Sequence, residues 1–557
     1  MPVVRLVYAT LLLVAVALAV PAPTRAVPGP DSVAVLANAN VPESVALARM
    51  YAVARQVPAT QVCAVDVPAD VTIPLATFES SVRAGLESCL ASAGALDRIE
   101  AVVVVRGMPL RVAIPTGNGD RRVSIAAALG LWRSTTDGDV PVLGQEPGQV
   151  ADCGGTPCYA ARWSNPFRSG TFEAGFSRDL PRLSWRPLLV TMLHGRTYED
   201  AARLVTSAVA AEETGAARGE FLFMEAADSA RGRLDAEITA VMAALTDRGV
   251  AEVARTPFDP DLTGRTLGAF FTGTAGIGTT IEGNTWAPGS LVDNLTSLGA
   301  VPQNFEATGE SQVSIARWVA MGVGGAHGTT DEPLNNVFPS RWLIVDYVDG
   351  STLAEAYHRR LPNVYWQNLV LGDPMLAPYA VRPEVVIEGV VPGEEVAGAR
   401  RVVVTATDPE GMGIASLVLL VNGVEIARVD GDRIEACVSV PVADDVQLLA
   451  VAQKLDDGTE RGLQRPKGWA EVRVKGLAGP ATCPDATDGG LGDGGSDTDA
   501  SVPDAGPTGG GGGDGGGCGC MTAEGGARGM PAVVLLALAW VRCLRGRGRR
   551  RRPPIRR

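Results

Sequence analysis

Short apolar runs alternate with amphipathic stretches along the first two thirds of the chain. The run 102–105 is apolar at every position, which indicates a strand buried on both faces of a parallel sheet. The stretch 78–90 instead carries an apolar side chain at every fourth position, as one face of a helix does. This alternation predicts a layered α/β fold with a mostly parallel sheet and right-handed crossovers.

The same reading gives a set of expected elements. Strands are predicted at 33–36, 61–67, 102–105, 188–191, 221–223, 267–271, 324–328 and 369–371, with a further one leading out of 291–301. Helices are predicted at 42–57, 78–90, 197–208, 234–245, 315–321 and 352–360. Thr197 and Asp200 have the spacing of a helix N-terminal cap. Together these elements define an α/β domain over residues 31–380.

Residues 112–185 interrupt the alternation. They are rich in Gly, Pro and Asp and show no regular period. We therefore expect an irregular insertion on the sheet near 112–185.

From residue 383 to 475 the pattern changes to short β-runs at close spacing. Asn422-Gly423 between two of these runs is a strong signal for a hairpin turn. This segment predicts a separate all-β sandwich. Residues 476–517 consist almost entirely of Gly, Asp, Ser, Thr and Pro, which cannot bury enough apolar surface to fold, so we expect a disordered stalk there.

Both ends of the chain have the pattern of targeting segments. Residues 1–26 combine a basic start, an apolar stretch and small residues at the end, as a secretory signal peptide does. Near the other end, 530–541 is an apolar run that spans only about 18 Å as a helix, which is short for a stable membrane span. The nine arginines that follow it would stay on the cytoplasmic side. Cys518 and Cys520 precede the run and are expected sites of lipid attachment.

Charge and cysteine usage restrict the function further. The net charge of −13 becomes −24 without the nine tail arginines, Arg5 and Arg25. A mature protein this acidic repels nucleic acid, so we expect no nucleic-acid partner. Six cysteines lie outside the tail, and an even number in an exported chain indicates disulfides. We expect a Cys153–Cys158 bridge across a Gly- and Pro-containing loop. By region alone, we expect further pairs between Cys63 and Cys89 and between Cys437 and Cys483.

The tail resembles the MYXO-CTERM sorting signal of myxobacterial surface proteins. The matching features are Cys518-Gly519-Cys520, the apolar run and the four arginines 549–552, so residues 518–557 form the resembling segment. The resemblance implies export through the secretion translocon, cleavage by a membrane sorting protease of the myxosortase type, and display on the outer surface. The alternative that the residues leave open is an ordinary C-terminal membrane anchor.

The α/β domain resembles an uncharacterised exported bacterial family of species with exosortase-type sorting. The matching pieces include Ala37-Asn-Ala-Asn40, Arg106-Gly-Met-Pro-Leu-Arg111 and Leu371-Gly-Asp-Pro-Met-Leu376. More distantly it is similar to gingipain-like cysteine peptidases with a caspase-like sheet. Those proteins carry a His after one strand and a nucleophilic Cys after the next, whereas this chain has Thr272-Gly273-Thr274 and Thr296-Ser297 there. The segment 383–475 resembles bacterial Ig-like modules, on Asp408 to Gly413 and Val421-Asn-Gly423.

The remaining chemistry-bearing residues are few. His358 follows Tyr357 on a predicted helix and is expected at the surface. His194 and His327 each follow or end a strand, and Asp331 and Glu332 come shortly after His327. One histidine with two carboxylates has the ligand types of a divalent metal site, although a solvated acidic turn has the same sequence.

These observations favour a non-catalytic, surface-anchored binding protein with a degenerate peptidase-like domain and no cofactor. Two alternatives stay open: a hydrolase with its site near His194, His327, Asp331 and Glu332, and a metal-dependent adhesin.

Overall fold

The computed structural model describes residues 28–115, 121–132, 188–215, 218–305, 310–333, 335–363, 365–455 and 466–483. The backbone of two short strands, β7 (Ala151–Asp152) and β8 (Pro157–Cys158), is also described. By its internal contacts the chain divides into Met1–Ala486 and Thr487–Arg557, and every described residue lies in the first unit.

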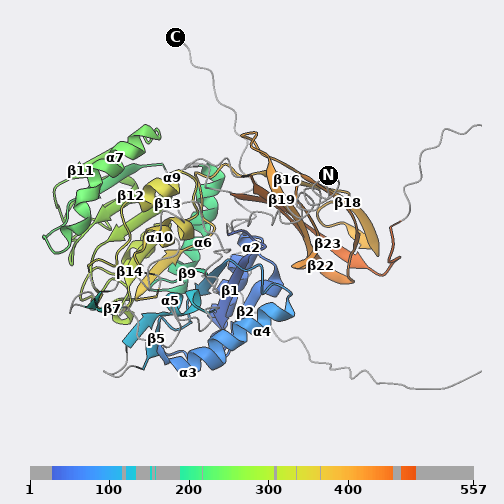
Figure 1. Cartoon of the computed structure of the whole chain (residues 1–557), viewed down its shortest axis with the longest axis horizontal. Helices are drawn as coiled ribbons and strands as arrows, with labels where there is room; N and C mark the ends of the chain where they lie inside the picture. Colours follow the sequence, from blue (N-terminus) through green and yellow to red (C-terminus); the bar gives the residue numbers. More distant parts are fainter. Residues whose placement is uncertain are drawn as a thin grey trace, which may run out of the picture. The chain divides into compact units, whose positions relative to one another are not determined.

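A ten-stranded sheet forms the centre of the α/β domain (Figure 1). Its order is β11 (Val253–Thr256), β10 (Glu220–Met224), β12 (Thr266–Thr272), β13 (Thr285–Asn294), β14 (Gly325–Thr329), β15 (Asn368–Gly372), β9 (Leu189–Leu193), β4 (Ala101–Val105), β1 (Val33–Asn38) and β2 (Val62–Val65). All neighbours are parallel except β14 and β15, which are antiparallel. The predicted mostly parallel sheet is confirmed, but it consists of two parallel halves that run in opposite directions.

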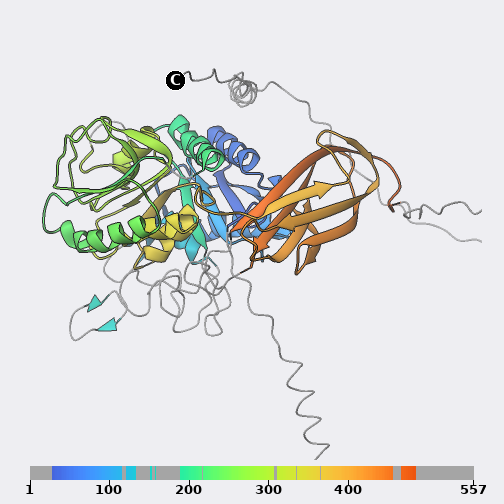
Figure 2. The same ribbon diagram turned by 90° about the horizontal axis from the view of Figure 1, so that it is seen from above.

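Helices cover both faces of this sheet (Figure 2). They are α2 (Pro42–Ala54), α3 (Leu75–Thr77), a π-helical stretch (Phe78–Arg83), α4 (Ala84–Ser92), α5 (Ile125–Gly130), α6 (Tyr198–Thr214), α7 (Ile238–Asp247), α8 (Ile315–Ala320), α9 (Leu343–Val348) and α10 (Leu353–Arg360), with short 3-10 turns at Ala59–Gln61, Gly232–Glu237 and Pro302–Phe305. Successive strand residues point to opposite faces, so Phe271 packs with α7 and α9 while Phe270 packs with Trp318 of α8. Thr197 and Asp200 cap α6 reciprocally, as their spacing predicts.

The start of the segment 112–185 is more regular than its composition indicated. β5 (Arg111–Ile114) pairs with β3 (Thr72–Pro74) and with β6 (Arg121–Ser124) in a small sheet. α5 follows directly, with all of its residues buried. Apolar residues of β5 and α5 join the main core, which is why this part of the chain forms regular elements.

The C-terminal part of the described chain forms two further sheets, drawn in orange to red in Figure 1. One has the order β16 (Glu384–Glu388), β18 (Ala399–Thr407), β21 (Arg433–Ser439), and the other β17 (Glu395–Ala397), β23 (Lys467–Leu477), β22 (Ala443–Lys454), β19 (Ile414–Val421), β20 (Val424–Val429). Val404 from the first sheet and Leu419 from the second belong to one buried core. Asn422 and Gly423 both have positive φ, at 47° and 81°, which confirms the predicted hairpin turn between β19 and β20.

Two of the three expected disulfides are formed. Cys63 in β2 bonds Cys89 in α4, and Cys437 in β21 bonds Cys483. The Cys153–Cys158 pair lies outside the residues whose side chains are described. Within the described ranges, no helix is both long enough and apolar enough to cross a membrane, and the run 530–541 lies beyond them.

Buried polar contacts join the α/β domain to the β-sandwich. Lys467 of β23 donates to the Asp31 carboxylate at 3.1 Å and to Ser32 Oγ at 3.0 Å. Glu212 of α6 accepts from Arg55 at 2.7 Å and from Arg382, which precedes β16, at 3.1 Å. We call Arg55, Glu212, Asp373, Arg382 and Tyr51 the junction cluster. Since β23 supplies several of these contacts, the sandwich packs directly on the α/β domain.

Candidate functional site

The carboxyl ends of β12, β13 and β14 meet at one edge of the sheet, which is where ligands bind in open α/β folds. The register aligns Asp293 of β13 with Phe271 of β12 and with His327 of β14. Asn294, the next residue, aligns with Thr272. The segments 272–274 and 296–297 that the sequence analysis singled out also begin at this edge, so we take it as the candidate site.

Asp293, His327, Arg341 and Asn368 form a buried polar group at this edge, which we call the inner cluster. Oδ1 of Asp293 lies 2.8 Å from Nδ1 of His327, and its Oδ2 accepts from Arg341 Nη1 at 2.5 Å. Arg341 Nη2 also donates to the Thr272 carbonyl at 2.6 Å. One guanidinium thereby links the ends of β12 and β13 to the segment before α9. Both oxygens of the carboxylate have partners.

The histidine of the inner cluster is held at both ring nitrogens. Its Nε2 lies 2.9 Å from Oδ1 of Asn368, whose amide nitrogen donates to the Asn363 carbonyl at 3.2 Å. Phe338 and Tyr357 contact the ring from outside, with centroids 5.5 and 6.2 Å away. The side chains of His327 and Asp293 are both 0% exposed. A carboxylate–histidine pair orients a general base in many hydrolases, but here the second nitrogen faces an amide and has no contact with solvent.

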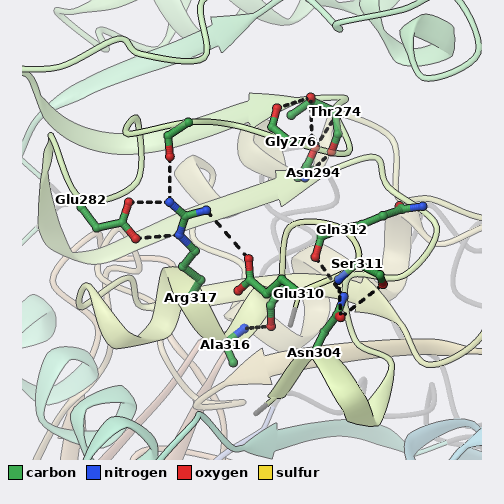
Figure 3. A network of polar contacts seen from close by, with 12 residues as sticks. Thr274, Gly276, Glu282, Asn294, Asn304, Glu310, Ser311, Gln312, Ala316 and Arg317 are labelled. Carbon is green, nitrogen blue, oxygen red and sulfur yellow. Dashed lines mark hydrogen bonds and ion pairs between the residues drawn. The ribbon is translucent and has the colours of Figure 1, made fainter. Parts of the chain in front are cut away.

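The loops beyond these strand ends are tied together by a separate polar network (Figure 3). Asn294 accepts from the Thr274 amide at 2.8 Å and donates to the Thr274 carbonyl at 3.0 Å. This reciprocal pair joins the loop after β12 to the last residue of β13. The amide pair therefore fixes the ends of two neighbouring strands at the edge where ligands bind in open α/β folds.

Arg317 at the start of α8 completes this network. Its guanidinium binds Glu282 in a bidentate contact, at 2.6 and 2.7 Å, and donates to the Gly278 carbonyl at 2.7 Å. Glu310 lies 3.8 Å from the same guanidinium (Figure 3). Within the loop after β13, Asn304 donates to the carbonyls of Leu298 and Gln312 and so closes a turn. The contacts of Arg317 with Glu282 and Glu310 thus cross-link the loop after β12 and the loop after β13.

The structure does not gather the four residues expected to form a hydrolase site. In the sheet, β9 lies two strands away from β14, and His194 lies three residues beyond the position on β9 that is level with His327. The Cα atoms of the two histidines are therefore roughly 14 Å apart. Asp331 is held in an ion pair with Arg122 of β6 at 2.6 Å. Glu332 is exposed on the turn that follows. Across the described ranges no three His, Cys, Asp or Glu side chains come close enough together to hold a metal ion.

His194 lies in a different environment from His327. It is buried at the end of β9 against Phe305, with ring centroids 4.5 Å apart. Its Nδ1 has no hydrogen-bond partner within the described residues. Burial, together with the nearby charge of Arg106, lowers the pKa of His194 from 6.5 to about 3, so the ring is neutral at physiological pH.

His358 is buried, which corrects the expectation that it lies at the surface. Its Nδ1 faces the Ala354 carbonyl at 2.8 Å, and the Val190 amide donates to its Nε2 at 3.4 Å. Burial lowers the pKa of His358 to about 4. The sequence was misleading because the adjacent arginines mark the helix as exposed, whereas every residue of α10 up to Arg359 is buried.

Comparison with known proteins leaves the chain without a family: no family model and no curated protein matches it. Among solved structures it is similar to one entitled "Structure of Protease", with a TM-score of 0.39 and 11% identity over 80% of this chain and 98% of the other. Fibronectin(III)-like modules of Clostridium thermocellum CbhA match 21% of the chain, over 53% of theirs, at 18% identity and a TM-score of 0.14. The Saccharomyces cerevisiae separase–securin complex matches 33% of the chain, over 14% of its own, at 12% identity and a TM-score of 0.23. Scores this low assign neither fold family nor function.

Proposed function

We propose that this protein is exported, held at the cell surface by its C-terminal segment, and acts there by binding, without catalysis. In this proposal the α/β domain is a degenerate caspase- or gingipain-like domain, and residues 383–475 are an Ig-like domain. The observation that carries the proposal is the reciprocal Asn294–Thr274 amide pair. The Asn294 side chain and the Thr274 backbone satisfy each other, so neither residue supplies a nucleophile or a base at the ends of β12 and β13.

The binding surface in this proposal is the cross-linked loop region around Arg317. Glu282 is 47% exposed and Arg317 is 21% exposed, so both present charge to solvent while holding the loops. Loops fixed on the carboxyl ends of strands are common binding elements, because a rigid scaffold keeps their side chains in place. Loops held in one arrangement lose little conformational entropy when a ligand binds.

A hydrolase that uses His327 is the second candidate, and the Asp293–His327 contact is the observation in its favour. Against it, the ring is fully enclosed and Asn368 occupies the nitrogen that a substrate proton would reach. A metal-dependent adhesin at Asp331 is less favoured, because Arg122 already neutralises that carboxylate.

Export is supported by the two disulfides, since such bonds persist mainly in oxidising compartments. The partners that we propose for export and attachment are the secretion translocon and a myxosortase-like protease. The mature chain would end near Cys518 or Cys520 and carry lipid there.

Incubation of the exported chain with a peptide library, with and without a thiol alkylator, tests the absence of catalysis. We expect no cleavage in either sample. Cleavage that disappears on alkylation would overturn the proposal in favour of a cysteine peptidase. Cleavage lost in His327→Gln but retained in His194→Gln would instead support the hydrolase.

Mass spectrometry of the surface-exposed form tests the attachment. We expect a C-terminus near Cys518 with a lipid adduct, and retention of the precursor in the inner membrane when both tail cysteines are replaced by Ala. A surface form that still contains the arginines 549–552 would show that the tail is only a membrane anchor.

A further inference from the structure

The last described residues are fastened to the β-sandwich after its final strand has ended. β23 ends at Leu477, whose carbonyl accepts from the Gly398 amide at 3.0 Å. The Pro480 carbonyl accepts from the Ala399 amide at 2.7 Å, and Cys483 then bonds Cys437 of β21. The chain therefore crosses from the five-stranded sheet to the three-stranded sheet before it continues to residue 484.

This crossing decides where a pull on the C-terminal segment is transmitted. Tension that arrives at Cys483 passes through the disulfide to Cys437, which pairs with Arg401 inside the β18–β21 ladder. The covalent path then runs back through β21, β20, β19, β18, β17 and β16 to the α/β domain. The 46-residue separation between the two cysteines contains β22 and β23, which carry no load on this path.

The strand that is bypassed holds the contacts to the α/β domain. Lys467 of β23 binds Asp31 and Ser32, and Trp469 lies under the guanidinium of Arg382 at 4.7 Å. Without the disulfide, tension would enter β23 at Leu477 and break its pairs with β22 and β17 one after another, starting at that end. Detachment of β23 would then break the contacts that this strand makes to the α/β domain.

We propose that the Cys437–Cys483 disulfide is a load bypass, which transfers tension from the C-terminal segment to β21 of the three-stranded sheet, so that β23 is not pulled from its sheet at Leu477. The biological use of such a bypass rests on the proposed surface attachment. A chain anchored at its C-terminus and bound to a ligand by its α/β domain is pulled in this geometry.

Single-molecule stretching of the full chain, with a handle at each end, tests the proposal. In the oxidised protein, we expect the sandwich to unfold in one step without releasing the chain between Cys437 and Cys483. In Cys437→Ser/Cys483→Ser, the 46-residue separation should add roughly 150–165 Å of released length at about 3.3–3.6 Å per residue. We also expect a new early step at lower force, in which β23 detaches.

The disulfide of the α/β domain supplies the matched control. Cys63→Ser/Cys89→Ser should add roughly 85–95 Å to the unfolding of the α/β domain, from a separation of 26 residues, and leave the sandwich step unchanged. If the serine variant of the sandwich fails to fold, reduction of the folded Cys63→Ser/Cys89→Ser variant during stretching gives the comparison without opening the Cys63–Cys89 bond.

A second variant examines the interdomain contacts. Lys467→Met removes the contact that Lys467 of β23 makes to Asp31. In the oxidised chain it should leave the force of the sandwich step unchanged, whereas in the Cys437→Ser/Cys483→Ser background it should lower the force of the early step.

Two results would overturn the proposal. The first is a serine variant whose sandwich releases the longer length in a single step at the wild-type force, because the disulfide would then stabilise the fold without redirecting tension. The second is an oxidised chain that already shows the early step. Both measurements apply force through handles, so they are independent of whether the cell attaches the chain at Cys518.

Discussion

Asp293 in the inner cluster is buried and Glu212 in the junction cluster is partly buried; both carboxylates have arginine partners, but they join different parts of the molecule. Asp293 connects β13 to His327 and Arg341 within one domain. Glu212 connects α6 to Arg55 of the same domain and to Arg382 at the start of the β-sandwich. The inner cluster therefore fixes the ends of neighbouring strands, and the junction cluster fixes one domain on the other.

The difference matters for inferring function from buried charge. A buried charge is costly unless partners replace its hydration, and both carboxylates have a full set of partners. In the inner cluster this arrangement imitates a catalytic carboxylate–histidine pair, whereas in the junction cluster no such resemblance arises. A catalytic carboxylate–histidine pair differs from a structural one in that its histidine contacts solvent and has a ring nitrogen without a protein partner.

Replacing Arg341 by Met should produce the largest effect. The substitution leaves Asp293 buried with His327 as its remaining side-chain partner, and removal of one partner from a buried pair costs about 3–5 kcal/mol. Guanidinium chloride unfolding at pH 7 measures the loss. A loss below about 1 kcal/mol would show that the inner cluster does not support the strand ends, and its likeness to a catalytic pair would need another explanation.

The loss of stability on acidification should show how much Glu212 of the junction cluster contributes to the free energy of unfolding. Burial alone would raise the pKa of Glu212, but the charges of Arg55 and Arg382 lower it from 4.5 to about 2. A depressed carboxyl pKa stabilises the fold above about pH 4.5, and this contribution is lost as the pH falls towards 2. Between pH 5 and 2.5, we expect wild type to lose about 2.5 kcal/mol more stability than Glu212→Gln.

Asp373, the other carboxyl of the junction cluster, makes that comparison necessary. Burial raises the pKa of Asp373, which favours the folded state as the pH falls and so acts in the opposite direction. Only the difference between wild type and Glu212→Gln isolates Glu212. Equal acid slopes in the two proteins would mean that Arg55 and Arg382 do not hold this carboxylate in solution.

His358, whose pKa is lowered by burial, gives a milder pH effect. Its pKa of about 4 in the fold lies below the value of 6.5 in the unfolded chain, so the unfolded state binds the proton first as the pH falls. The fold should lose about 2 kcal/mol through this residue between pH 7 and 5. We expect His358→Gln to flatten this part of the stability profile, measured by urea unfolding. An unchanged slope would place the ring in contact with water.

Replacing Arg317 by Gln should have the smallest effect on stability. Its partner Glu282 is 47% exposed, and ion pairs that reach solvent contribute about 0–1 kcal/mol. We expect a loss of this size in unfolding experiments, reduced further at high salt. A loss as large as that of Arg341→Met would mean that the loop network supports the fold as strongly as the inner cluster does.

Much of the fold can be predicted from the local sequence pattern, and each element that was not predicted has a physical reason. The run 102–105 is strand β4, and the fourfold spacing in 78–90 falls on continuous helical turns. β11 was not predicted, because an edge strand is half exposed and lacks an apolar run. The reversal between β14 and β15 was also missed, because strand direction depends on how the chain returns to the sheet.

The candidate site was harder to predict than the fold. His327 stood out because histidines are rare in this chain, but its partner Asp293 sits inside an apolar stretch and Arg341 follows 48 residues later in a loop. Asn294 gave one usable signal, since a polar residue at the carboxyl end of a buried strand lies at the edge where ligands bind.

The sequence by itself determined what depends on neighbours along the chain. The alternation of strands and helices, the Thr197–Asp200 cap and the Asn422-Gly423 turn follow from backbone conformation and local hydrogen bonds. The tertiary structure alone decided which charges are buried together, that His358 is enclosed, and that Cys483 fastens the chain to β21. These features depend on residues far apart in sequence, whose meeting is set by packing of the whole fold.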